Sequence, residues 1–452
     1  MTKHQLIWQR KDFPAGFQFG TATSAYQIEG HQFGGAGTTH WDTFAATSDN
    51  VIRAEHGGRA CDHYHRYPED IDLIAHAGFD AYRFSTSWAR ILPSGRGQIN
   101  QTGLDFYDRL VDQLCQKNIA PHLTLYHWEL PSSLADKGGW RNRDIALWFA
   151  DYTDIVVQRI GDRLASVAPI NEPWCVSWLS HMLGQHAPGL RDICATARSM
   201  HHVLLAHAKA IEVMRSLGQE NLGMIANLEW PQPYDISKSA RQAADLYDDY
   251  YNNFFLSGVF KGSYPDAIVR GLGAHLPDHW QDDLPLISQP VDWCGINYYT
   301  SKQIKPNQGP WPSHDDLPGD QPKTQMGWDI YPQGLHDFLL RTQQNFTGDT
   351  PIFITENGMA NADIITPDGV LDYARIDYIN RHLYSVHQAL NQGVPIKGYF
   401  VWSLLDNYEW SFGYEKRFGI VHVDFDTLQR TPKASYYALA NMLDGPQRRP
   451  IC

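Results

Sequence analysis

The sequence predicts an α/β protein in which eight parallel strands close into a single barrel. Short apolar segments alternate with amphipathic helical segments from one end of the 452-residue chain to the other. Eight apolar segments can be counted, and eight such strands close into a (β/α)8 TIM barrel. No Gly/Ser-rich or charged linker divides the chain, so we expect one domain over residues 1–452, with its functional site at the C-terminal ends of the strands.

The predicted strands are the short apolar runs themselves. In chain order they are residues 17–25, 81–87, 120–127, 165–171, 222–228, 293–299, 352–356 and 398–403. Because helical segments separate these runs, we expect parallel strands joined by right-handed crossovers.

Helices are predicted where apolar residues recur at three- and four-residue spacing, which gives each helix one buried face. These segments are residues 68–80, 105–118, 144–161, 195–218 and 374–393. The Pro- and Gly-rich stretch 305–323, between the sixth strand and the next helix, is predicted to be a loop at the rim of the site.

Charge and composition narrow the class of ligand. The chain has 37 basic and 50 acidic residues and a net charge of −13, which disfavours nucleic acid and anionic membranes as partners. No segment approaches the roughly 20 apolar residues of a membrane span, and the first residues resemble no signal peptide, so we expect a cytoplasmic protein. The six cysteines (61, 115, 175, 194, 294 and 452) form no CxxC pair and are expected to be reduced. Aromatic residues make up 13% of the chain, which fits a carbohydrate ligand because rings stack on sugars.

Polar side chains gather at the predicted C-terminal ends of the strands, where a barrel carries its reacting groups. The sequences there are SAYQIEG (24–30), YHWEL (126–130), INEP (170–173), INYY (296–299), TENG (355–358) and WSLLDNYEW (402–410). They supply amide, imidazole, carboxylate and indole groups where a hydrophobic core would supply none.

Two of these residues form a candidate carboxylate pair, Glu172 after the fourth strand and Glu356 after the seventh. Glu356 alone could be a solvated loop acid, but a pair at the mouth of a barrel is what glycoside hydrolysis requires. One acid protonates the departing oxygen, and the other carboxylate attacks the anomeric carbon or activates water. Asn171, beside Glu172, could donate a hydrogen bond to a sugar 2-hydroxyl.

A series of motifs also occurs in order along nearly the whole chain. They are FGTATSAYQIEG (19–30), CDHYHRYPEDIDL (61–73), YRFSTSWARILP (82–93), NEP (171–173), GINYY (295–299), MGWDI (326–330), ITENG (354–358), WSLLDNYEW (402–410) and KRFGIVHVD (416–424). Together they resemble the glycoside hydrolase family 1 β-glucosidases.

The resemblance implies roles for the two glutamates. Glu172 would be the general acid/base and Glu356 the nucleophile of a retaining double displacement through a covalent glycosyl-enzyme. Arg83, on the second strand, is expected near Glu356, because an adjacent cation keeps a carboxylate ionised. Tyr299 is expected to hydrogen-bond to Glu356.

The resemblance also implies a pocket for one sugar unit. Gln27 and His127 are expected at the 3- and 4-hydroxyls, Asn171 at the 2-hydroxyl, and Trp402 beneath the sugar as a stacking platform. Trp128 would support this inner pocket.

Glu409 and Trp410 would complete that pocket, Glu409 toward the 4- and 6-hydroxyls and Trp410 toward the 3-hydroxyl. Trp328 would flank the leaving-group side, and Asn297 would lie close to the catalytic pair. A carboxylate at Glu409 would repel a 6-phosphate, so an unphosphorylated sugar is expected.

The implied function is an exo-acting β-glucosidase that cleaves terminal β-D-glucosyl units from aryl glucosides or short cello-oligosaccharides. Related activity on β-D-fucosides and β-D-galactosides is expected. The alternatives are a 6-phospho-β-glucosidase and a non-catalytic sugar-binding barrel.

No cofactor or metal is assigned. His63 and His65 could suggest the metal pair of an amidohydrolase, but they precede a predicted helix rather than end a strand, which favours a structural role. The stretch 33–37 (FGGAG) lacks the setting of a nucleotide loop. Glu129, where the family usually has Asp, is expected to be a solvated or capping loop acid.

Overall fold

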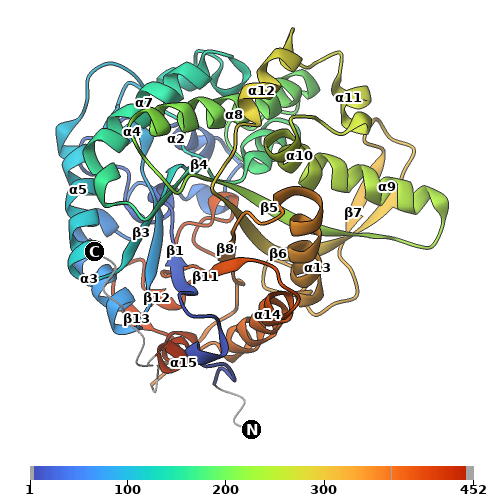
Figure 1. Ribbon diagram of the computed structural model, residues 1–452. Coiled ribbons are helices and arrows are strands. Elements are labelled where there is room, and N and C mark those ends of the chain that lie inside the picture. Colours follow the sequence, from blue (N-terminus) through green and yellow to red (C-terminus); the bar gives the residue numbers. More distant parts are fainter. Residues whose placement is uncertain (1–4, 368, 444–452) are drawn as a thin grey trace.

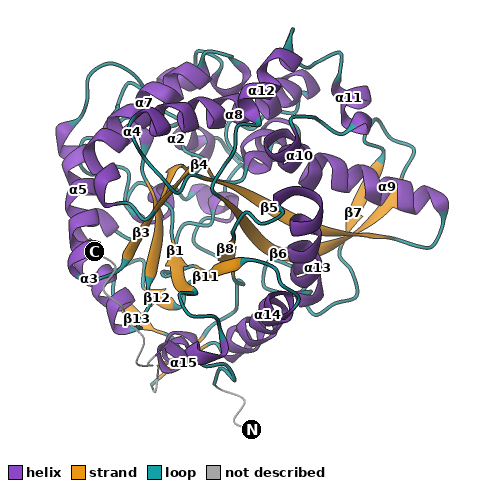
Figure 2. Ribbon diagram, in the orientation of Figure 1, coloured by secondary structure: helices purple, strands orange, loops and turns teal. Residues whose placement is uncertain are grey.

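Parallel strands form the centre of the molecule, and helices surround them (Figure 1, Figure 2). The computed structural model describes residues 5–367 and 369–443. The strand order in the sheet is β4-β3-β2-β1-β11-β8-β6-β5. Two parallel bridges, Val167 to Leu222 and Asn171 to Ile225, join β4 to β5 and close the sheet into a barrel.

All eight predicted strands are present. They are β1 (Gln18–Ala22), β2 (Ala81–Ser85), β3 (Ala120–Tyr126), β4 (Ser166–Ile170), β5 (Gly223–Pro233), β6 (Trp293–Pro306), β8 (Ile352–Asn357) and β11 (Ile396–Trp402). The interior positions of most of these strands are buried, which is why they read as continuous apolar runs in the sequence.

The predicted loop over residues 305–323 is in part a β-hairpin, so that prediction was wrong. β6 continues through Pro306 and pairs antiparallel with β7 (His314–Leu317), from Gln303 opposite Leu317 to Pro306 opposite His314. In Figure 1 this arm extends beyond the barrel beside α9 (Lys238–Asp248). The Pro and Gly residues mark the turn of the hairpin, and their density hid the short arms on either side.

The five predicted helices correspond to α3, α5, α7, α8 and α14. Together with α9, the α-helices around the strands are α1 (Ala25–Ile28), α2 (His40–Ala46), α3 (His63–His76), α4 (Trp88–Ile91), α5 (Gln101–Gln116), α6 (Ser132–Ala135), α7 (Ile145–Ile160), α8 (Ile193–Ser216), α10 (Phe254–Lys261), α11 (Asp266–Leu272), α12 (Leu284–Ile287), α13 (Pro332–Thr342), α14 (Tyr373–Asn391) and α15 (Ala434–Leu443). α3 begins five residues before the predicted start, since Pro68 lies inside the helix rather than at its first turn.

Two short hairpins, β9 (Ile364–Thr366) with β10 (Gly369–Leu371) and β12 (Val421–Val423) with β13 (Arg430–Pro432), lie outside the barrel sheet. One cluster of buried apolar side chains extends from Phe13 to Leu443.

Three cysteines, Cys61, Cys175 and Cys294, are buried free thiols, whereas Cys452 lies outside the described residues. Within residues 5–367 and 369–443, no helix combines the length and the apolar character needed to cross a membrane.

Candidate active site

Glu356 lies near the end of β8, where the pairing of that strand is irregular on both sides. Pairing with β6 jumps from Ile354 to Glu356, and pairing with β11 jumps from Ile354 to Asn357. Such bulges redirect side chains and are common beside active sites. The apolar run before Glu356 is therefore a buried strand, and the bulge places its carboxylate at the C-terminal end of the barrel.

Glu172 follows β4 and is held against the neighbouring strand. Its backbone N–H donates to the carbonyl oxygen of Ile225 on β5 at 3.2 Å. Glu172 has a φ of 50°, and Trp128 and Trp410 have φ values of 83° and 51°. A non-glycine residue in this left-handed region costs roughly 1–3 kcal/mol, and such residues cluster at active sites. The surrounding contacts must hold these three residues against that strain.

Donors that stabilise the ionised form surround Glu356. Arg83 Nη1 donates to Oε1 at 2.5 Å, and the Tyr299 hydroxyl donates to Oε2 at 2.6 Å. Burial raises the pKa of Glu356, and the charge and hydrogen bonds of Arg83 and Tyr299 oppose this effect. The ring of Trp328 lies 5.6 Å from that of Tyr299 and so borders the same carboxylate.

Two amide side chains connect the glutamates. Arg83 Nη2 donates to Oδ1 of Asn171 at 2.7 Å, and Asn297 Nδ2 donates to the same oxygen at 3.0 Å. Asn297 Nδ2 also donates to Oε1 of Glu172 at 2.6 Å. Glu356 is thus linked to Glu172 through three buried side chains.

Glu172 has neutral donors only, and the described residues form no ion pair with it. The Cys175 thiol donates to Oε2 at 3.1 Å, and the Asn297 amide occupies Oε1. Burial, and then the negative charge of Glu356, raise the pKa of Glu172 to about 8. Glu172 therefore favours its protonated form, whereas the cation and the hydroxyl donor beside Glu356 favour the ionised form of that residue, which is the division of roles that an acid and a nucleophile need.

Some polar atoms at this end of the barrel are buried without a hydrogen-bond partner among the described residues. They include Nδ1 of His127 and Oε2 of Glu409. The other ring nitrogen of His127 lies 3.2 Å from Asn171 Nδ2. Burial, and then the charges of Glu356 and Glu172, raise the pKa of Glu409 to about 8. Because buried polar atoms normally have partners, these atoms are positions where ligand hydroxyls can bind.

Gln27, in α1 directly after β1, is held by the segment that follows β11. Its Nε2 donates to Asn407 Oδ1 at 3.0 Å and to the carbonyl oxygen of Tyr408 at 2.8 Å, while Ser24 donates to its Oε1 at 2.6 Å. The same segment carries Glu409, so these two predicted sugar contacts are fixed relative to each other.

Aromatic rings form a wall of the site. The His127 ring is stacked with Trp402 at 5.7 Å and with Trp410 at 6.3 Å. Trp128 lies 4.9 Å from Trp410 and donates its indole N–H to the carbonyl oxygen of Asn171 at 3.0 Å. An indole ring exposed to a ligand here can stack on the apolar face of a sugar.

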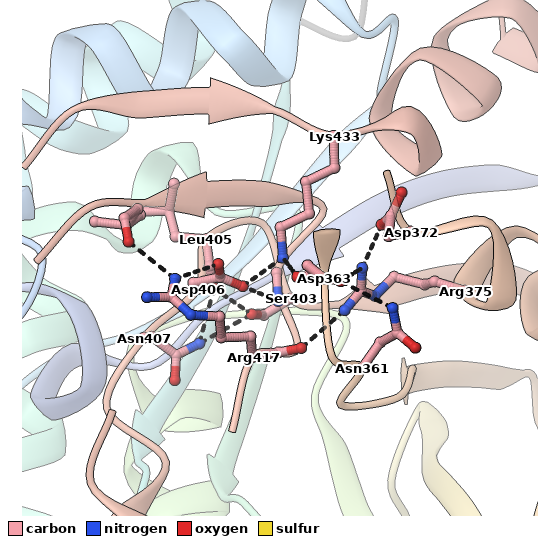
Figure 3. Close-up of polar contacts among 12 residues, drawn as sticks. Asn361, Asp363, Asp372, Arg375, Ser403, Leu405, Asp406, Asn407, Arg417 and Lys433 are labelled. Carbon is pink, nitrogen blue, oxygen red and sulfur yellow. Dashed lines mark hydrogen bonds and ion pairs between the residues drawn. The ribbon is translucent and has the colours of Figure 1, made fainter. Parts of the chain in front are cut away.

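A network of buried charges supports the segment from Ser403 to Trp410 (Figure 3). Lys433 is fully buried, with its Nζ 2.6 Å from Asp406 Oδ1 and in contact with Asp363. Arg417 pairs with the other oxygen of Asp406 at 2.8 Å. Since Asp406 directly precedes the asparagine that binds Gln27, this network fixes the segment that holds Gln27.

The prediction that Glu129 is a solvated or capping loop acid was wrong. The residue is 1% exposed, and both carboxyl oxygens are buried without a partner among the described residues. Burial raises the pKa of Glu129 well above its usual range. The reason is a long-range contact, because the chain near Thr39 and His40 pairs with Pro131 and Leu130 and covers this turn.

His63 and His65 lie in the first turn of α3. The buried His63 ring binds Asp70 at 2.8 Å, and the exposed His65 ring binds Asp62 at 2.6 Å. In the part of the chain that the structure describes, no three His, Cys, Asp or Glu residues are grouped to hold a metal ion.

Sequence reasoning missed Cys175 and Asn407. The signal for Cys175 is its position three residues after Glu172, at the start of a π-helical turn (Cys175–Leu179), because helical spacing brings such side chains together. Asn407 had no separate signal, because it lies inside the motif WSLLDNYEW (402–410), in which the sugar-binding roles were assigned to other residues.

Comparisons with known proteins agree on one family. The family model described as "Glycosyl hydrolase family 1" matches residues 9–445. The chain is 43% identical over 438 residues to a protein named β-glucosidase A of Thermotoga maritima, covering 96% of this chain and 98% of that one. It is 40% identical over 454 residues to a bifunctional β-D-glucosidase/β-D-fucosidase of Bifidobacterium breve, covering 94% and 96%. A solved Thermotoga maritima β-glucosidase in complex with deoxynojirimycin has a TM-score of 0.93 at 42% identity, covering 95% and 98%.

Proposed function

Because the chain belongs to glycosyl hydrolase family 1, we propose that it is a retaining, exo-acting β-glucosidase that removes terminal non-reducing β-D-glucosyl residues. The observation that carries this proposal is the buried hydrogen-bonded array between Glu356 and Glu172. It surrounds one carboxyl group with a cation and the other, among the described residues, with neutral donors only, which supports the opposite protonation states that double displacement requires.

In the proposed mechanism, Glu356 attacks the anomeric carbon while Glu172 donates its proton to the departing glycosidic oxygen. A covalent glycosyl ester forms on Glu356, and its negative charge disappears. Since that charge raised the pKa of Glu172, its loss favours ionised Glu172. Glu172 then takes a proton from water, which attacks the anomeric carbon from the face opposite the ester. The bond to Glu356 breaks, its carboxylate is regenerated, and glucose is released with retained configuration.

Recognition of the sugar is proposed to use the groups assembled around this pair. Gln27, His127 and Glu409 would bind hydroxyls, and the unpartnered atoms of His127 and Glu409 support this role. Asn171 would contact the 2-hydroxyl, where its link to Arg83 couples binding to the nucleophile. Trp402 would provide the stacking surface, with Trp128, Trp410, Asn297 and Trp328 around it.

The preferred sugar is proposed to be unphosphorylated glucose. Glu409 is an acid, and neither of its protonation states offers a phosphate the cation it needs. Side activity on β-D-fucosides is supported by the bifunctional relative. A solved relative in complex with galacto-hydroximolactam supports side activity on β-D-galactosides. A non-catalytic barrel is disfavoured because both carboxyls and their partners are present.

Three finer points remain predictions. They are a single domain over residues 1–452, a cytoplasmic location, and cello-oligosaccharides as the natural substrates. Residues 1–4 and 444–452, which belong to that predicted domain, lie outside the described residues.

Proton NMR of the enzyme cleaving an aryl β-D-glucoside tests the proposal. We expect β-glucose to appear before mutarotation, since two inversions restore the original configuration. α-Glucose as the first product would rule out the double displacement. Absence of turnover would support the non-catalytic alternative, and turnover of the 6-phosphoglucoside alone would support the phospho-β-glucosidase.

A further inference from the structure

The oxygen of Glu172 that is not bound by an amide lies against a thiol. Cys175 Sγ donates to Glu172 Oε2 at 3.1 Å, and the cysteine is only 6% exposed. The contact is built into the local backbone, because Val176 N–H, one residue after Cys175, donates to the carbonyl oxygen of Glu172 at 3.2 Å, and Cys175 begins the π-helical turn. π-Helical turns occur often at functional sites.

The thiol has a second neighbour that orients it. Asn227, on β5, directs its Nδ2 toward Cys175 Sγ at 3.7 Å and donates to the Tyr251 hydroxyl at 3.0 Å. Because the sulfur accepts from Asn227, its hydrogen is left for Glu172. Burial, and then the charge of Glu172, raise the pKa of Cys175 well above its usual value, so the group stays a neutral donor.

The other oxygen of Glu172 is the less favourable site for the proton that the reaction needs. Asn297 Nδ2 donates to Oε1 at 2.6 Å, and the orientation of this amide is fixed because Thr355 donates to Asn297 Oδ1 at 2.6 Å. The carbonyl oxygen of a neutral carboxyl group accepts a hydrogen bond better than its hydroxyl oxygen does, so an N–H that points at Oε1 favours the carbonyl form there. The proton of neutral Glu172 is therefore favoured on Oε2, the oxygen beside Cys175.

We propose that Cys175 is a positioning residue for the proton-donor oxygen of Glu172, which its thiol holds by a hydrogen bond whenever Glu172 is ionised. This inference rests on the proposed role of Glu172 as acid/base. Sulfur is a weak acceptor, so the thiol binds the carboxylate without retaining the proton once Glu172 is neutral. A leaving-group oxygen then competes easily for that proton.

Other ionisable groups also influence Glu172 or its thiol partner and must be kept unchanged in a test. They come from other elements of the fold and are Arg83, Glu229, Tyr251, Tyr299, Glu356 and Glu409. A substitution confined to Cys175 leaves all of them in place, so a change in the titration of Glu172 reports the thiol.

The test measures kcat/KM against pH for cellobiose, whose leaving group needs protonation. In Cys175→Val the donor is lost, the ionised form of Glu172 is less stable, and the alkaline limb should move up by about half a pH unit or more. Cys175→Ser restores a donor and should return the limb to the wild-type position or below it. Cys294→Ala, which removes a buried thiol on β6 away from Glu172, is the matched control and should leave the limb unchanged.

Two outcomes overturn the inference. One is an alkaline limb of the pH profile that does not move in Cys175→Val. The other is a loss of activity that is equal at every pH and is not rescued in Cys175→Ser, because a loss of packing alone would explain that result. If the valine variant fails to fold, an upward shift in Cys175→Ser contradicts the inference by itself. The variant Glu172→Ala tests the proposed function separately from the role of Cys175. A larger loss of activity on cellobiose than on an activated aryl glucoside would support Glu172 as the acid, whatever the results for the Cys175 variants.

Discussion

Two groups of buried carboxyls in this chain have opposite surroundings. In the network that supports residues 403–410, Asp363 and Asp406 share Lys433, and Arg375 adds a second cation to Asp363 at 3.2 Å. Burial would raise the pKa of Asp363, but the charges of Arg375 and Lys433 outweigh it and hold that pKa below its usual value.

In the active site, Glu172 and Glu409 have no such cation among the described residues. Burial and neighbouring negative charge raise the pKa of each to about 8. Of these three acids, Glu356 alone has an ion pair within residues 5–367 and 369–443, with Arg83. Buried acids with a structural role are paired with cations in this fold. Acids that are proposed to donate a proton to the substrate or to bind its hydroxyls have no paired cation in the described part of the chain.

The largest expected effect comes from removing the one paired acid of the site. Glu356→Gly should lower hydrolysis of an aryl β-glucoside by roughly 10⁴-fold or more, because the nucleophile is lost. Azide or formate should restore cleavage and give the inverted product, detectable by NMR. Wild-type-like activity without either anion would exclude Glu356 as the nucleophile.

Removing an unpaired acid should have a selective effect. Glu172→Ala should lower kcat/KM for cellobiose by roughly 10²–10⁴-fold, whereas an activated aryl glucoside should lose much less in glycosylation, since its leaving group needs no proton. Steady-state kinetics on both substrates provides the measurement. Equal losses on the two would argue against Glu172 as the acid.

Removing a cation from the buried charge network around Lys433 should lower stability. Lys433→Met should leave Asp363 and Asp406 without their shared cation and lower the free energy of unfolding by about 3–5 kcal/mol. Denaturant unfolding measures this change. Lys209→Met, which breaks the exposed pair with Glu212, is the matched control and should change stability by less than about 1 kcal/mol. Similar results for both variants would show that burial of the ion pair is unimportant.

The smallest expected effect is a gain in stability that depends on pH. The pKa of Glu409 is raised on folding, so the acid is neutral in both states near pH 4, and its native form becomes unfavourable as pH rises toward 8. Glu409→Gln removes this titration and should stabilise the protein by roughly 1–2 kcal/mol at pH 7 and little at pH 4. Unfolding at both pH values tests it, with the exposed Glu212→Gln as control. A gain independent of pH would point to another cause.

The sequence was sufficient for the barrel and for the strand-end residues, because both leave local marks. Apolar runs define strands, and acids at their ends stand out, as at Glu356. The burial of Glu129 was missed because a distant segment covers it, and the hairpin from Gln303 to Leu317 was missed because the Pro and Gly residues of its turn hid its short strands. The thiol beside Glu172 depends on a backbone turn whose π-helical form no spacing rule specifies.

The closure of the barrel lies next to Glu172, the proposed proton donor. Among the described residues, β4 and β5 join through the bridges at Val167 and Asn171 rather than through a continuous ladder, and Glu172 is the next residue after the second bridge. A line with so few backbone hydrogen bonds is where local opening and amide exchange should begin. Mild heating would then disorder Glu172 while most of the barrel is still folded. Thermal inactivation would therefore precede thermal unfolding, and the time for which the protein stays active would depend on the junction between β4 and β5.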